Sequence, residues 1–484
     1  MDIAFRTAVA LVEALRDKEI GSLELLDHFH ARMERHNPAL DAIVFTDMDA
    51  ARARAREADS ALARGESWGP LHGLPMTVKE SYDVVGMPTT WGVPALADNI
   101  ATTNALSVQR LIDAGAIVFG KTNVPIHLAD WQSYNAIYGT TNNPWDLTRT
   151  PGGSSGGSAA ALATGLTGLE AGSDIGASIR NPAHYCGVYG HKPTYGIVPP
   201  RGQALPGVVA PTDISVVGPM ARGAEDLAVA LDVMAGPDPI EAAGWKLDLR
   251  PPRRARLDQY RVALVLEDPC AEVDVEVQER LQAMADFLRG AGATVVEGAR
   301  PAFSSQEANE VYTMLLRAAT SRRLSDEAFA ANVELARSVD PNDPSYAARM
   351  VRAQVMAHRD WLGYNERRHR MRLQWAAFFE DHDLMLCPAA SSTAFPHDHA
   401  GERHERTVVV NNKKVLTTDQ MFWAGYSGFA YLPSTVAPAG LTPHGLPVGV
   451  QIIGPQYGDR ECIAFAALLE REYQGFVAPP GYDP

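Results

Sequence analysis

The sequence has little of what a disulfide-bonded, zinc-held or nucleic-acid-binding protein requires. Only four of its 484 residues are cysteines, and they lie far apart with no CxxC pair. This usage fits a reducing, cytoplasmic compartment and offers neither a disulfide framework nor a zinc site. Lys and Arg total 43 against 58 Asp and Glu, a formal net charge of −15. Because nucleic-acid binding depends on basic surfaces, this balance argues against a nucleic-acid partner.

Long uninterrupted apolar runs are also missing. The apolar N-terminus is broken by Glu13 and Arg16 and is too short and too charged for a signal peptide. A charge-free stretch separates Asp419 from Asp459, but it contains five prolines and seven glycines. A membrane-spanning helix needs about 20 apolar residues with few breaks. We therefore expect no membrane partner and a buried, loop-rich segment at 420–458.

What the chain does contain is an alternation of helical and strand-like patterns. Residues 261–266 read as a strand, 275–289 as a helix and 293–296 as a second strand. A helix at 107–113 followed by a strand at 116–119 repeats the arrangement. The alternation predicts an α/β architecture with parallel strands.

Two familiar motifs match the sequence by residue spacing, but the secondary structure expected around them does not fit either motif. Gly115 to Thr122 fits a phosphate-binding P-loop, yet its central residues are a strand core and a helix precedes it. Gly152 to Gly156 fits the GxSxG nucleophile elbow, but the residues before it are polar and broken by proline instead of forming a strand. Neither nucleotide binding nor an α/β-hydrolase site is expected.

Serines in two glycine-rich segments indicate the type of chemistry. The Gly/Ser segment 151–163 runs directly into an alanine-rich helix, which linkers seldom do, and 172–180 is a second tight turn around a serine. Close-packed backbone N–H groups beside serine hydroxyls suggest acyl transfer, in which serine attacks a carbonyl and N–H groups hold the oxyanion.

Such a serine needs a base, and Lys79 is one candidate. His127, His184 and His191 are nearby in sequence, but none has a carboxylate placed for a triad. Lys79 follows an apolar strand-like run, so its stem would be buried. To be neutral at pH 7 it needs a pKa about three units below the reference of ~10.4, and full burial supplies shifts of that size.

Several spaced motifs together resemble the amidase signature family. They occupy the following segments: 71–80, 120–123, 143–146, 151–160, 173–183, 187–194 and 445–451. The resemblance covers roughly 5–235 and 385–475. It implies one α/β domain, 1–484, with a large mixed β-sheet core surrounded by helices. Within it the expected parts are N-terminal helices (1–66), a catalytic core (67–235 and 385–484) and a mostly helical elaboration (236–384).

The family resemblance also implies roles for individual residues. It makes Ser178 the nucleophile, Lys79 the base and Ser154, on a cis peptide, the relay between them. The oxyanion hole would consist of backbone N–H groups from these residues: Ile175, Gly176, Ala177 and Ser178. Ser155 and Asp174 would support the loops, and no metal or cofactor is implied. The polar loop with His397, Asp398 and His399 is read as a rim or surface loop.

Departures from the family pattern bear on the substrate. Ala177 stands where a second glycine is usual, which costs little if its φ is negative and would narrow the acyl side of the site. Glu80 replaces the more usual Asp. Residues 423–433 lack the Asn- and Gly-rich pattern of glutamine-specific members. These features favour an apolar or aromatic substrate.

The aromatic loop resembles the acylamidase branch and makes three residues candidate substrate contacts: Trp131, Tyr134 and Tyr138. The predicted function is a cytoplasmic serine amidohydrolase, monomeric or homodimeric, that acts on small aryl or alkyl acylamides and on esters. The alternatives are a carbamate-cleaving (urethanase-like) amidase and a glutaminase subunit of a tRNA-dependent complex. A non-catalytic scaffold is disfavoured because Lys79, Ser154 and Ser178 occur together.

Overall fold

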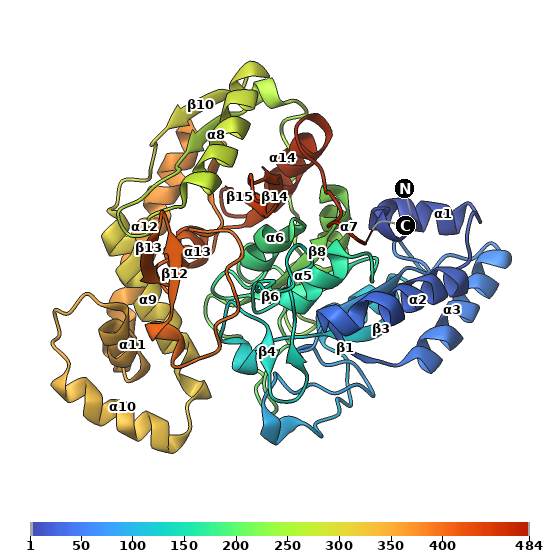
Figure 1. The fold of residues 1–484 in the computed structure, drawn as a ribbon, viewed down its shortest axis with the longest axis horizontal. Helices are drawn as coiled ribbons and strands as arrows, with labels where there is room; N and C mark the ends of the chain where they lie inside the picture. Colours follow the sequence, from blue (N-terminus) through green and yellow to red (C-terminus); the bar gives the residue numbers. More distant parts are fainter. Residues whose placement is uncertain (1–2, 483–484) are drawn as a thin grey trace.

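An eight-stranded mixed sheet forms the centre of the molecule in the computed structural model, which describes residues 3–482 (Figure 1). The first three strands in the order below are parallel to one another, and all the remaining pairings are antiparallel. In spatial order the strands are β10 (Thr294–Glu297), β9 (Arg261–Leu264), β11 (Leu384–Pro388), β15 (Pro447–Ile453), β14 (Ser434–Leu441), β7 (Tyr189–Lys192), β8 (Val216–Ala221) and β6 (Glu170–Asp174).

Helices from distant parts of the chain pack against this sheet. In α8 the buried residues form an apolar stripe that includes Leu281, Met284 and Leu288 at helical spacing, whereas α5 and α6 are buried along their whole length. Asp274 caps α8 by accepting a hydrogen bond from the Glu276 N–H at 3.1 Å. The packed helices are α5 (Gly156–Ala163), α6 (Arg180–Cys186), α7 (Ala224–Met234), α8 (Val275–Gly290) and α14 (Asp459–Glu472).

A second sheet of three strands places Lys79 in the interior. Its order is β1 (Ile43–Thr46), β3 (Ile117–Thr122) and β2 (Pro75–Lys79), so Lys79 is the last residue of a fully buried strand. β2 also lies beside β6 of the large sheet. The helices of this N-terminal region, on the right in Figure 1, are α1 (Ala8–Arg16), α2 (Ser22–Leu40), α3 (Met48–Ala63) and α4 (Leu106–Asp113).

A helical region follows β10 and extends to the left of the molecule in Figure 1, where α10 and α11 lie at its margin. α9 and α12 pack together, and α9 also contacts α13. The elements of this side are α9 (Ser305–Thr320), α10 (Asp326–Ser338), α11 (Tyr346–Gln354), α12 (His358–Asp381), α13 (Met421–Gly428) and the hairpin of β12 (Thr407–Val410) and β13 (Lys413–Leu416). β4 (Tyr134–Asn135) and β5 (Gly139–Thr140) form a separate two-stranded antiparallel ribbon.

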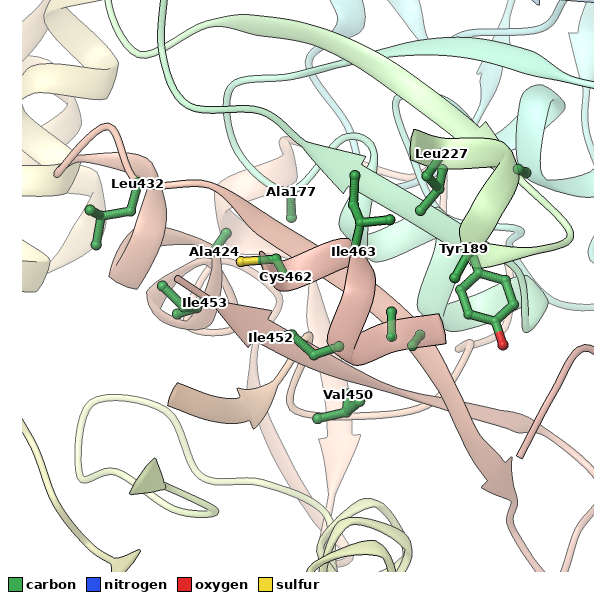
Figure 2. Packing of buried hydrophobic residues seen from close by; sticks show 14 of the residues in the cluster. Ala177, Tyr189, Leu227, Ala424, Leu432, Val450, Ile452, Ile453, Cys462 and Ile463 are labelled. Carbon is green, nitrogen blue, oxygen red and sulfur yellow. The ribbon is translucent and has the colours of Figure 1, made fainter. Parts of the chain in front are cut away.

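One large cluster of buried apolar side chains runs from the N-terminal helices through the helical region to α14. Figure 2 shows part of it, with Val450, Ile452 and Ile453 of β15 near Cys462 and Ile463 of α14. The charge-free segment is buried over most of its length, as predicted, but it is not loop-rich, because it forms α13, β14 and β15. Because this cluster includes residues from all three expected parts of the chain, we propose that they form a single domain.

The predicted elements and the observed ones agree at the level of type and approximate bounds. β9, α8 and β10 occupy the predicted strand, helix and strand, and the two strands are parallel. The parallel arrangement does not extend across the sheet, because β15, β14, β7, β8 and β6 pair antiparallel. No helix within residues 3–482 is both long and apolar enough to cross a bilayer.

Candidate active site

A buried lysine and two serine hydroxyls form the centre of the site. The amine Nζ of Lys79 lies 2.6 Å from the Ser154 Oγ and 3.0 Å from the Ser173 Oγ. Gln203 donates from Nε2 to the same Ser173 Oγ at 3.1 Å. A neutral amine has two N–H donors and one lone pair. With Ser173 taking the donors, the lone pair is left to accept the hydroxyl proton of Ser154.

The surroundings of Lys79 favour its neutral form. Its side chain is 0% exposed, and the structure shows no ion pair for it among residues 3–482. Burial lowers the pKa of Lys79 well below its ordinary value, and the Arg323 charge acts in the same direction. The carboxylates of Asp174, Glu170 and Glu80 oppose this shift without reversing it. The neutral amine that the sequence argument required is therefore the form that burial favours.

Ser154 lies in the loop just before α5. This loop is hydrogen-bonded to the separate turn that contains Ser178. The Gly153–Ser154 peptide bond is cis. The backbone N–H of Ser155 donates to the Ser178 carbonyl at 3.1 Å, and the Ser155 hydroxyl donates to the Ser173 carbonyl at 3.5 Å. These two hydrogen bonds of Ser155 connect the two glycine-rich segments.

Asp174 shapes the turn that carries Ser178. Its carboxylate accepts hydrogen bonds from the N–H groups of Ala177 and Ile179 at 3.0 and 3.1 Å and forms a buried ion pair with Arg180, whose Nη2 lies 2.8 Å away. Burial alone would raise the pKa of Asp174, but the Arg180 guanidinium holds it below its ordinary value. Arg180 also reaches the charge-free segment, donating to the Ala424 carbonyl at 2.9 Å.

Breaking this pair is expected to destabilise the whole protein. Arg180→Met leaves the Asp174 carboxylate buried without its counter-charge, which should cost about 3–5 kcal/mol of unfolding free energy. Urea denaturation followed by circular dichroism measures the loss. Arg370→Met removes an exposed arginine and is the control, expected to change stability by less than about 0.5 kcal/mol. A loss below about 1 kcal/mol for Arg180→Met would contradict this account.

Three of the four predicted oxyanion donors are available. The N–H groups of Ile175, Gly176 and Ser178 have no hydrogen-bond acceptor within the described part of the chain. The Ala177 N–H is different, because it already donates to Asp174. The Ala177 N–H is therefore not an oxyanion donor, contrary to the prediction. It stabilises the turn by its hydrogen bond to Asp174.

The negative φ on which the expectation for the Ala177 side chain depended is not found. The φ of Ala177 is +72°, in the left-handed region, where an L-residue costs roughly 1–2 kcal/mol. The methyl group is buried in the apolar cluster, part of which Figure 2 shows, and burial of one carbon returns about 0.8 kcal/mol. Ala177 is not among the residues that line the cavity at Ser178, so it does not narrow that space.

A cavity of about 200 Å³ opens at Ser178. Trp131 forms part of its wall and donates from its indole Nε1 to the Gly176 carbonyl at 2.7 Å. The other residues around the cavity include Leu128, Asp130, Ile175, Gly176, Leu316, Arg317, Arg323, Leu324, Arg403 and Met421. The Ser178 hydroxyl makes no hydrogen bond to any described residue, which leaves it free toward this space.

Two of the three predicted aromatic contacts lie elsewhere. The ring of Tyr134 stacks on His399 at 3.6 Å between centroids and its hydroxyl accepts from Arg406. The Tyr138 hydroxyl donates to the Glu80 carboxylate at 3.3 Å. Neither tyrosine lines the cavity, since both are engaged with neighbouring loops. Of the three, only Trp131 stays a candidate substrate contact.

Comparison with known proteins identifies the family. The family model described as Amidase matches residues 24–463. A glutamyl-tRNA(Gln) amidotransferase subunit of Synechococcus sp. (strain CC9605) is 33% identical, and the match covers 99% of each chain. The chain belongs to the amidase signature family. It is therefore an amidase, a hydrolase that acts on carbon–nitrogen bonds other than peptide bonds.

Solved structures agree with this amidase fold. One described as an amidase is 26% identical with a TM-score of 0.77, covering 96% of this chain and 99% of the other. A bacterial aryl acylamidase of the amidase signature enzymes family has a TM-score of 0.79 at 24% identity, covering 97% of this chain and 96% of that one. At that identity the likeness to the acylamidase shows the fold alone.

Sequence reasoning missed the arginines of the amidase cavity. Arg317 lies on α9, Arg323 ends the 3₁₀ helix Ser321–Arg323, and Arg403 begins the 3₁₀ helix Arg403–Glu405. The sequence gives no signal for them, because an arginine facing a cavity cannot be told from a surface arginine by its sequence neighbours. The aromatic run after Met421 packs elsewhere: Trp423 and Tyr426 belong to the apolar cluster and do not line the cavity.

The P-loop match in the amidase is part of the scaffold. Lys121 lies within β3, and its amine donates to the carbonyls of Glu80 and Pro88 at 3.1 and 2.9 Å and to that of Tyr82. Burial lowers the pKa of Lys121 to about 8. Because its donors hold the loop that follows Lys79, Lys121 has a structural explanation that needs no phosphate.

Proposed function

We propose that this amidase hydrolyses small amides, including aryl or alkyl acylamides, and esters through an acyl-enzyme on Ser178. The observation that carries the proposal is the buried, neutral-favoured Lys79 within 2.6 Å of Ser154, beside a cavity that contains Ser178 and unpaired backbone N–H groups. This arrangement supplies a base, a relay, a nucleophile and oxyanion donors in one place.

In the proposed first half-reaction, Lys79 accepts the proton of Ser154 while Ser154 accepts the proton of Ser178. The Ser178 Oγ attacks the amide carbonyl, and the N–H groups of Ile175, Gly176 and Ser178 stabilise the oxyanion. The proton held by Lys79 returns through Ser154 to the leaving amine as the carbon–nitrogen bond breaks. No hydrogen bond joins the Ser154 and Ser178 hydroxyls within residues 3–482, so the relay closes when the Ser178 hydroxyl turns toward Ser154.

In the second half-reaction, water replaces the amine. It gives a proton to the same relay and attacks the acyl carbon, and the Ser178 oxygen leaves with a proton returned through Ser154. The products are a carboxylic acid and the free amine or alcohol. Only protons move through Lys79 and Ser154, so the chemistry needs no cofactor.

The second candidate is ammonia release from glutamine, as in a tRNA-dependent amidotransferase. Curated relatives at 30–33% identity that cover nearly the whole chain are named as subunits of glutamyl-tRNA(Gln) amidotransferase, which favours this candidate. Such a protein would act with partner proteins. The carbamate-cleaving alternative shares the same acyl-enzyme chemistry and differs only in the substrate.

A substrate panel distinguishes these candidates. Purified protein is given acetanilide, butyramide, N-succinyl-4-nitroanilide, 4-nitrophenyl acetate, ethyl N-phenylcarbamate and glutamine, with release of amine, alcohol or ammonia measured for each. We expect kcat/KM for the best acylamide to exceed that for glutamine by at least about tenfold, a difference of about 1.4 kcal/mol in transition-state binding. A preference for glutamine, with partner proteins co-purifying, would replace the main proposal by the second, and a preference for the carbamate by the third.

A further inference from the structure

Three arginines with no acidic partner surround the cavity at Ser178. Arg317, Arg323 and Arg403 all line it, and none forms an ion pair among the described residues. Guanidinium groups stay charged in proteins, so the cavity wall carries three positive charges. Removing charge from water without a counter-charge is costly, and such an arrangement indicates a ligand that supplies the missing negative charge.

The hydrogen bonds of these arginines leave donors unused. The Arg323 Nη1 donates to the His127 carbonyl at 2.9 Å, and the Arg403 Nη1 donates to the Ala129 carbonyl at 3.0 Å. Arg317 reaches the Tyr346 hydroxyl through Nη2. The Nε atoms of Arg317 and Arg403 are buried and have no hydrogen-bond partner among the described residues. A guanidinium has five N–H donors, so each side chain retains donors for a ligand.

The one carboxylate at the cavity, among residues 3–482, is already paired. Asp130 forms an ion pair with Arg406, whose Nη1 lies 2.7 Å from the Asp130 Oδ2. Burial, with the neighbouring Arg403 adding to it, lowers the pKa of Arg317 to about 9, and burial lowers that of Arg323 to about 10. Both values are low for arginine, and they still leave the groups charged at pH 7. His127 adds no negative charge, and the single Asp130 carboxylate, which acts on Arg403 but is ion-paired with Arg406, does not balance three arginines.

We propose that this cavity binds a substrate carboxylate, and that the enzyme therefore acts on small amides bearing a carboxylate near the scissile bond. The inference rests on the proposed function and narrows its substrate class. Arginine favours planar carboxylates through paired hydrogen bonds. Trp131, Leu316 and Met421 give the cavity an apolar wall against which a short hydrocarbon part of the substrate can pack. A cavity of about 200 Å³ suits a small molecule, since drug-sized ligands occupy about 300 Å³ or more.

Two isosteric anilides test the proposal in the wild-type enzyme. N-succinyl-4-nitroanilide ends in a carboxylate, whereas 4-methylpentanoyl-4-nitroanilide has a neutral isopropyl group of the same shape. A second pair, N-acetyl-4-aminobenzoate and N-acetyl-4-toluidine, differs by a ring carboxylate in place of a methyl group and puts the charge on the amine side instead. In one of the two pairs we expect kcat/KM to be about tenfold higher, or more, for the charged member. Charge-assisted hydrogen bonds to the arginines would stabilise that member in the cavity. Equal rates or a preference for the neutral member in both pairs would overturn the proposal.

Variants show whether the arginines cause the preference. Arg317→Gln and Arg403→Gln should each reduce the charged-to-neutral ratio of kcat/KM by about tenfold or more. Arg322→Gln is the matched control, because Arg322 adjoins Arg323 in the chain but is exposed and does not line the cavity. Its ratio should equal that of wild type. An unchanged ratio in both cavity variants would contradict the inference.

A binding measurement separates this inference from the proposed chemistry. Calorimetry with the Ser178→Ala protein, N-succinyl-4-nitroanilide and its neutral isostere needs no turnover. Tighter binding of the carboxylate compound, weakened by Arg317→Gln, would support the anion site even if the amide chemistry were wrong. No preference for the carboxylate compound would reject the anion site even if Ser178 proved to be the nucleophile.

Discussion

Ser178→Ala should reduce amide hydrolysis by about 10⁴- to 10⁶-fold, because it removes the atom that forms the acyl-enzyme. The fold should be unaffected: the hydroxyl makes no hydrogen bond to any described residue, so no buried partner is left unsatisfied. The measurement is kcat/KM for the best acylamide of the panel, with circular dichroism and thermal unfolding as checks on the fold.

Covalent labelling identifies the nucleophile directly. Phenylmethylsulfonyl fluoride should add one sulfonyl group to the wild-type protein, located at Ser178 by mass spectrometry, and none to Ser178→Ala. Ser67→Ala removes an exposed serine that does not line the cavity and should keep both activity and label. A label on Ser154 would reverse the roles of the two serines, and turnover within tenfold of wild type in Ser178→Ala would end the acyl-enzyme proposal.

Lys79→Met should abolish amide turnover, with a loss of about 10³-fold or more, because the base in contact with Ser154 disappears. In the wild type, activity should rise with pH through the pKa of Lys79, which burial places well below its ordinary value. Acid protonates Lys79 and blocks its acceptance of the Ser154 proton. A pH-independent rate between pH 5 and 9 would count against Lys79 as the base.

The same substitution should change stability in a pH-dependent manner. Below its unfolded pKa of ~10.4, Lys79 must lose a proton on folding, so the unfolded chain binds more protons and wild-type stability rises with pH. The slope from one such group is about 1.4 kcal/mol per pH unit between the folded and unfolded pKa values. Methionine has no proton to lose, so the variant does not bear the free-energy cost of deprotonating this side chain on folding. Lys79→Met should therefore gain most over wild type near neutral pH, and the difference should shrink toward pH 10.

Urea denaturation at pH 7, 8, 9 and 10 measures this difference for wild type and variant. Lys246→Met removes an exposed lysine and is the control. The difference between its unfolding free energy and that of wild type should stay constant from pH 7 to 10. If Lys79 were protonated in the folded protein, the difference between Lys79→Met and wild type would be constant with pH. That outcome would remove the neutral base from the mechanism.

The site was predictable from the sequence where its signal is local. Glycines around Ser154 and Ser178 mark tight backbone turns, and the apolar run before Lys79 marks a buried strand, so these three positions could be singled out from residue order. Ser173 and Gln203 could not, because their importance lies in contacts that cross between segments. The sign of φ at Ala177 was equally inaccessible, since an Ala in a glycine-rich turn is compatible with either sign.

The sequence by itself determined the family, the mixed α/β architecture and the candidate nucleophile, relay and base, because each depends on residue types at fixed local spacing. The tertiary structure alone decided which donors face Ser178 and which charges surround the cavity. Arg317, Arg323 and Arg403 come from two separated parts of the chain, and only packing brings them together. Their convergence on one space, with Asp130 already paired, changes the expected substrate from a neutral amide to a carboxylate-bearing one.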